Sequence, residues 1–132
     1  MNTLPEKFGN TPLKRIVHLY SMIWKHIYGF EPTIQWGKIG KLLKPLYTEY
    51  TEWQVGALIC LHFNWRGASG EDEFIYKTLS ERAFPLEWLP QNANAYRAYI
   101  TNSLGVDWND REQLRQFAVD TVNQYKKDVN NR

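Results

Sequence analysis

The chain of 132 residues has the length of one domain, and its 43% hydrophobic and 23% charged residues exclude a disordered or fibrous protein. Aromatic residues reach 15%, which gives a small domain many large side chains to bury. The net charge of +2 divides into +5 over residues 1–47 (seven Lys/Arg, two Asp/Glu) and −3 over residues 48–132 (nine against twelve). This composition predicts a soluble, mostly helical domain with a basic N-terminal part.

Membrane and secreted proteins do not fit the pattern. No run approaches the ~18 apolar residues of a membrane helix, and the start Met1–Lys7 lacks the apolar stretch of a signal peptide. Cys60 is the only cysteine, which excludes an internal disulfide and a cysteine-based zinc site. We therefore expect a cytoplasmic protein with a flexible arm over residues 1–10 and a single helical domain over residues 11–132.

The first helix is expected between Thr11 and Gly29. Thr11 is a favourable N-cap and Pro12 suits the first helical position, while Gly29 suits a left-handed C-terminal cap. Apolar residues between them recur with a period near 3.6, at Leu13, Ile16, Val17, Tyr20, Ile23, Trp24 and Ile27.

A second and a third helix follow closely. The second is expected from Gln35 to Leu43 or Leu46, because Pro45 limits or kinks its last turn. Thr51 and Gln54 match a capping box that opens the third helix, whose core side is one stripe of Val55, Leu58, Ile59, His62 and Phe63. The short connection predicts a helical hairpin or helix-turn-helix.

Three further helices are expected in the rest of the chain. A loop over residues 66–70 leads to a fourth helix that opens on acidic residues 71–73 and ends before Pro85. Residues 84–90 contain two prolines and are expected to form a non-helical strap. Asn92 is expected to cap a fifth helix that Gly105 closes, and the last helix runs from Asn109 or Asp110 to about residue 129. The chain thus predicts an all-α bundle of about five to six helices with a helix-turn-helix-like hairpin.

The most informative local feature is the spacing of Lys38, Lys41 and Lys44. A spacing of three keeps these side chains on one side of a helix, opposite the leucines. Exposed ammonium groups contact nucleic-acid phosphates with a salt-dependent affinity. The alternative is that they form only the solvated face of an amphipathic helix.

Two tryptophans stand beside cations and are candidates for stacking on bases or on a partner protein. Trp36 precedes Lys38, and Trp65 precedes Arg66. The basic N-terminal part adds two more cations at the start of the first helix. The candidate nucleic-acid-binding residues are therefore Lys14, Arg15, Trp36, Lys38, Lys41, Lys44 and Arg66.

No residue pattern indicates catalysis, and we expect a protein that is not an enzyme and needs no metal or cofactor. His18 and His26 are eight residues apart, about 12 Å of helix rise, and are too distant to share a metal ion. His62 and Cys60 fall among apolar residues and are expected to belong to the core. The acidic residues 71–73 are explained by the helix macrodipole.

One further pattern is formed by Tyr20, Trp24-Lys25, Tyr28-Gly29, Pro32, Trp36-Gly37-Lys38, Gly40-Lys41-Leu42-Leu43, Tyr50-Thr51, Leu61-His62-Phe63 and Phe84-Pro85-Leu86-Glu87-Trp88-Leu89. Through this pattern, residues of about 20–100 resemble a small helical module of bacteriophage replication-initiation and replisome-organiser proteins. This resemblance implies contacts to DNA or to replication partners, with Lys38, Lys41 and Lys44 as the nucleic-acid contacts.

Three hypotheses for the function follow. The first is a non-enzymatic, phage-type DNA-binding protein that acts in replication or its control. The second is a phage-encoded protein-binding module that inhibits a host enzyme or defence complex through an interface of Trp, Tyr and Arg. The third is an assembly component whose surface charge serves solubility alone. The partner and the oligomeric state stay open.

Overall fold

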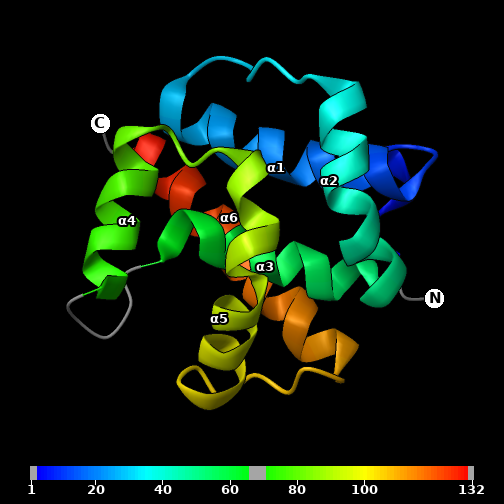
Figure 1. Cartoon of the computed structure of the whole chain (residues 1–132), viewed down its shortest axis with the longest axis vertical. Helices are drawn as coiled ribbons and strands as arrows, with labels where there is room; N and C mark the ends of the chain where they lie inside the picture. Colours follow the sequence, from blue (N-terminus) through cyan, green and yellow to red (C-terminus); the bar gives the residue numbers. More distant parts are fainter. Residues whose placement is uncertain (1–2, 66–70, 131–132) are drawn as a thin grey trace.

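The computed structural model describes residues 3–65 and 71–130, with side chains omitted at 71, 72 and 128–130. Within these ranges the chain is an all-α bundle without strands, as predicted (Figure 1). Its helices are α1 (Pro12–Tyr28), α2 (Trp36–Glu49), α3 (Glu52–Asn64), α4 (Glu71–Glu81), α5 (Leu89–Asn102) and α6 (Arg111–Asn130). Two short 3₁₀ helices, η1 (Glu6–Phe8) and η2 (Leu86–Trp88), precede α1 and α5.

Helix α3 is the centre of the bundle. It packs against α1, α5 and α6 (Figure 1), and every residue from Glu52 to Phe63 is buried. The prediction of a single apolar stripe on this helix is therefore wrong. A helix surrounded by other helices buries all of its faces, which is why apolar residues such as Ala57 and Leu61 also occur outside the expected stripe.

The predicted helix ends are confirmed where they depend on local hydrogen bonds. The Thr11 hydroxyl accepts a hydrogen bond from the Lys14 amide at 3.2 Å, and Gly29 ends α1 with a left-handed φ of 83°. Thr51 and Gln54 form both bonds of the capping box at α3. The backbone amides of Glu112 and Gln113 donate to the Asp110 carboxylate at the start of α6.

The second helix is longer than the sequence predicts. Helix α2 continues past Pro45 and Leu46 to Glu49, so Pro45 does not limit it. Pro45 lies on the exposed side, and the burial of Leu43 and Leu46 on the opposite side compensates for the one missing backbone hydrogen bond.

Residues 84–90 do not form a non-helical strap either. Residues 86–88 form η2 and α5 begins at Leu89, so that Pro90 occupies the first turn, where no amide proton is needed. Asn92 is inside α5 and does not cap it; its amide group donates to the Trp88 carbonyl at 2.9 Å.

The segment predicted as a flexible arm lies against α1 and α3 over its described residues 3–10. Leu4 is only 1% exposed, and its backbone amide donates to a Glu52 carboxylate oxygen at 3.2 Å. Phe8 stacks on His18 of α1, with 4.4 Å between ring centroids. These contacts join the N-terminal segment to the bundle.

The chain leaves α4 through two consecutive non-glycine residues with positive φ, Ala83 (62°) and Phe84 (49°). A left-handed conformation is unfavourable for residues with a Cβ atom. We expect Ala83→Gly to raise the free energy of unfolding by about 0.5–1 kcal/mol, measured by urea denaturation. The control is Gly29→Ala, which places a methyl group on a left-handed residue and is expected to lower the free energy of unfolding. A rise for Gly29→Ala, or a fall for Ala83→Gly, contradicts this expectation.

Candidate nucleic-acid interface

The lysines of α2 form one exposed surface. Lys38, Lys41 and Lys44 are all exposed, whereas Ile39 and Leu43 on the opposite side of the helix are 1% and 0% exposed. Among the described residues, none of the three lysines pairs with a carboxylate. We call Lys38, Lys41 and Lys44 the α2 lysine surface. The amphipathic spacing that predicted it is confirmed at the level of exposure.

The two glycines of α2 differ in their surroundings. A Cβ atom on Gly40 would lie 3.3 Å from a methyl carbon of Leu13, so this glycine allows α1 and α2 to pack closely. A Cβ atom on Gly37 would meet nothing within 4 Å. The backbone next to Lys38 is therefore open to an approaching group, and helix packing does not explain the glycine at position 37.

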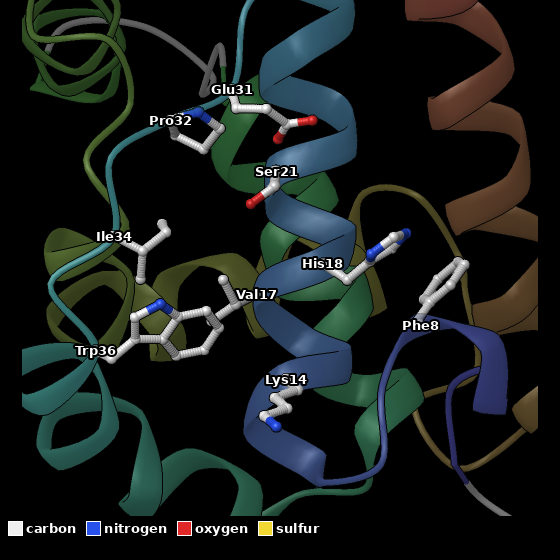
Figure 2. Close-up of a pocket in the computed structure, with 9 residues that line it drawn as sticks. All are labelled: Phe8, Lys14, Val17, His18, Ser21, Glu31, Pro32, Ile34 and Trp36. Atoms are coloured by element: carbon white, nitrogen blue, oxygen red, sulfur yellow. The ribbon is translucent and has the colours of Figure 1, made fainter.

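A groove of about 450 Å³ runs beside the beginning of α2, lined by Phe8, Lys14, Val17, His18, Ser21, Glu31, Pro32, Ile34 and Trp36. Figure 2 shows Trp36 and Ile34 on one side of α1 and Phe8 on the other. Trp36 is 48% exposed, so part of its ring is free to contact a ligand. The structure thus brings Lys14 and Trp36 to one groove. The carboxylate of Glu31 on its rim pairs with Lys25 at 3.4 Å.

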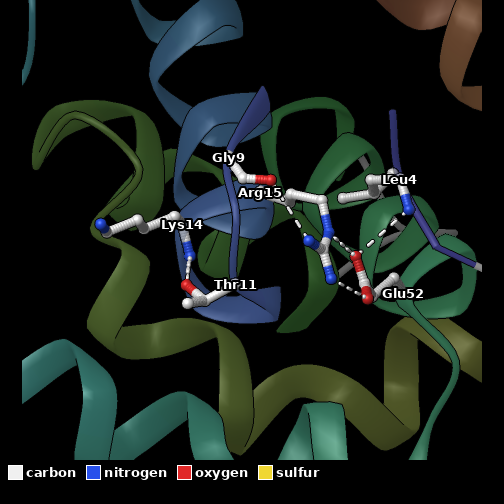
Figure 3. A network of polar contacts seen from close by, with 6 residues as sticks. All are labelled: Leu4, Gly9, Thr11, Lys14, Arg15 and Glu52. Atoms are coloured by element: carbon white, nitrogen blue, oxygen red, sulfur yellow. Dashed lines mark hydrogen bonds and ion pairs between the residues drawn. The ribbon is translucent and has the colours of Figure 1, made fainter. Parts of the chain in front are cut away.

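Arg15 is not part of an exposed basic surface. Its guanidinium donates to both carboxylate oxygens of Glu52, at 2.7 and 2.9 Å, and to the Gly9 carbonyl at 3.2 Å (Figure 3). Only 12% of the Arg15 side chain and 9% of the Glu52 side chain are exposed. The hydrogen bond that Arg15 donates to Glu52 raises the pKa of Arg15. Its charge is therefore neutralised within the fold, and we do not count it among the phosphate contacts.

The second tryptophan candidate is buried. Trp65 is 4% exposed and packs against the rings of Tyr96 and Tyr99, with centroid distances of 5.1 and 5.2 Å, so it offers no free face for a base. Its neighbour Arg66, and the loop predicted over residues 66–70, lie outside the described residues.

His62 is a core residue, as predicted. Its Nε2 atom lies 2.8 Å from the Pro85 carbonyl and its Nδ1 atom 2.8 Å from the Tyr96 hydroxyl. A carbonyl only accepts, so Nε2 carries the proton and Nδ1 accepts from the tyrosine. Burial lowers the pKa of His62 from 6.5 to about 4. Spacing on α3 placed this residue in the core, but nothing in the sequence pointed to Tyr96 as its partner.

Cys60 is also a core residue. Its side chain is fully buried, and burial raises the pKa of its thiol to about 12. This supports the prediction of an unreactive thiol. Among the described residues, no three His, Cys, Asp or Glu side chains come together in a group that could hold a metal ion.

Comparison of the chain with models of protein families, with curated proteins and with solved structures finds no match. Within the described ranges, none of the helices combines the length and the apolar character needed to cross a membrane. The candidate interface is accordingly defined by its own residues: the α2 lysine surface, with Lys14 and Trp36 on the adjoining groove.

Proposed function

We propose that this chain is a non-enzymatic DNA-binding protein that contacts phosphates through the α2 lysine surface. The observation that carries the proposal is the exposure of Lys38, Lys41 and Lys44 on one helix face without a carboxylate partner among the described residues. When unpaired ammonium groups bind DNA phosphates, they displace the counterions that were bound there. The release of these counterions is the main source of sequence-independent affinity.

Three further features support the same surface. The open backbone at Gly37 leaves room for a phosphate beside the first turn of α2, whose first amides have no partner within the helix and can bind an anion. No side chain of the N-cap residue Gln35 bonds to these amides. Trp36 and Lys14 extend the surface along the groove beside α1, where a half-exposed indole can stack on an unpaired base.

A role in phage replication or its control is the biological setting that we propose for this activity. It is supported by the resemblance of residues 20–100 to the helical module of replication-initiation proteins, which includes all three lysines of the surface. The helix-turn-helix role of α2 and α3 belongs to the same proposal; the two helices are joined by Tyr50 and Thr51 alone.

The first test is the triple variant Lys38→Ala/Lys41→Ala/Lys44→Ala. We expect it to bind a labelled duplex and a labelled single strand at least about tenfold more weakly than the wild type at low salt, because three phosphate contacts are lost. Fluorescence anisotropy measures the dissociation constants, and circular dichroism checks that the helices are retained.

The matched control is Lys77→Ala/Lys126→Ala/Lys127→Ala, which removes the same charge from exposed positions on α4 and α6. We expect this variant to bind DNA within about twofold of the wild type, because general attraction by net charge is weaker than direct phosphate contact. Equal losses in the two variants, or no binding by the wild type at low salt, contradict the proposal.

A further inference from the structure

A second groove, also about 450 Å³, lies between the N-terminal segment, α1 and α6, and none of its lining residues comes from α2. We call it the α1–α6 groove. Its lining residues come from residues 3–8, α1, α3 and α6, and none of them is acidic.

The floor of the α1–α6 groove is aliphatic. Met22, Val119 and Val122 are partly exposed in it, while Leu4 and Leu19 beneath them are buried. Flexible methionine and branched aliphatic side chains at the bottom of a groove are typical of surfaces that accept the apolar face of a helix.

The rim of the groove is basic. Lys7, His26 and Lys126 form no ion pair with a carboxylate of the described residues. Arg111 and Arg115 share a single carboxylate, that of Glu112, at 3.9 and 3.1 Å. The rim therefore keeps a clear excess of positive charge over an apolar floor, and its complement is a ligand with acidic groups around an apolar stripe.

We propose that the α1–α6 groove binds an acidic amphipathic helix of a partner protein. Leucine-like side chains of the partner contact Met22, Val119 and Val122, and its Asp and Glu residues contact Lys7 and Lys126. A single-stranded nucleic acid matches the charge of the rim but not the floor, because bases stack on exposed aromatic faces. Of the two aromatic residues in the groove, Trp53 is only 7% exposed and Phe8 already stacks on His18. This inference goes beyond DNA binding and does not depend on it.

The probe is a synthetic helical peptide of about four turns, with Leu at i, i+3, i+4 and i+7 and Glu at the other positions. Titration into ¹⁵N-labelled protein is followed by NMR, which detects dissociation constants up to the millimolar range. We expect chemical-shift changes at Met22, Val119 and Val122, and none with the same peptide carrying Lys in place of Glu. Absence of changes at 1 mM peptide, changes elsewhere, or equal changes with the Lys peptide overturn the proposal.

Two charge-reversal variants separate the rim from net charge. Lys7→Glu/Lys126→Glu is expected to weaken binding of the acidic peptide about tenfold, because two attractions become repulsions. Lys77→Glu/Lys127→Glu changes the net charge equally at exposed positions that do not line the groove and is expected to bind like the wild type. If both variants bind the acidic peptide equally weakly, net charge and not the rim of the groove determines the affinity, and the proposal is refuted. Displacement of the peptide from the groove by a single-stranded oligonucleotide assigns the groove to nucleic acid and likewise refutes the proposal.

Discussion

Replacing Arg15 by alanine is expected to lower the free energy of unfolding by about 3 kcal/mol. The Arg15 guanidinium satisfies both oxygens of the nearly buried Glu52 carboxylate and the Gly9 carbonyl, while Glu52 also accepts from the Leu4 amide. These contacts link the N-terminal segment, α1 and α3. Removal of the cation leaves a carboxylate 9% exposed without its charge partner, and the desolvation of that carboxylate is no longer offset.

The control for this variant is Lys25→Ala, which breaks the pair with Glu31. Both side chains of that pair are well exposed, at 59% and 64%, so we expect a cost below about 0.5 kcal/mol. Chemical denaturation measures both variants. The double variant Arg15→Met/Glu52→Leu is expected to recover part of the lost stability, since it removes both charges. Costs of equal size for Arg15→Ala and Lys25→Ala would show that the buried pair has no special role.

Acidification is expected to destabilise the protein through His62. Because the folded pKa of His62 is depressed to about 4 from 6.5, the unfolded state binds the proton first as the pH falls. The contribution of neutral His62 to the free energy of unfolding is fully present above about pH 6.5 and decreases between pH 6.5 and 4. The full effect amounts to about 3 kcal/mol, the free energy that corresponds to the difference between the two pKa values.

The measurement is the free energy of unfolding of the wild type and of His62→Gln from pH 7 to pH 4. Glutamine retains a donor and an acceptor for Pro85 and Tyr96 but does not titrate, so the variant should lose less stability over this range than the wild type, by about 3 kcal/mol. His18→Gln removes an exposed imidazole and is the matched control. Parallel pH profiles for the wild type and His62→Gln would contradict a neutral, buried histidine.

The helices were predictable from the sequence where their ends depend on neighbouring residues. Thr11, Gly29 and the Thr51–Gln54 pair act within one turn, so their effect is visible without tertiary structure. The effects of Pro45 and Pro90 are not predictable from neighbouring residues, because the cost of a proline depends on where it lies in the helix and on how the opposite side is packed. The central position of α3 depends on helices far along the chain.

In the candidate site, too, features that depend on neighbouring residues are predictable from the sequence, and features that depend on distant residues are not. The exposure of the three α2 lysines follows from the helical period and is predictable from the sequence. The burial of Arg15 in an ion pair is not predictable, because its partner Glu52 is 37 residues away in the sequence. The α1–α6 groove cannot be predicted from the sequence for a similar reason, since Leu4 and Val122 come to line one groove only through the fold.

The most direct test of DNA binding by the α2 lysine surface is the salt dependence of affinity for a duplex. With three to four phosphate contacts, the logarithm of the association constant is expected to fall against the logarithm of salt concentration with a slope of about −3. In Lys38→Ala/Lys41→Ala/Lys44→Ala, where at most the Lys14 contact remains, the slope should lie between zero and about −1. A wild-type affinity that does not change with salt, or a slope that the triple variant retains in full, contradicts the account.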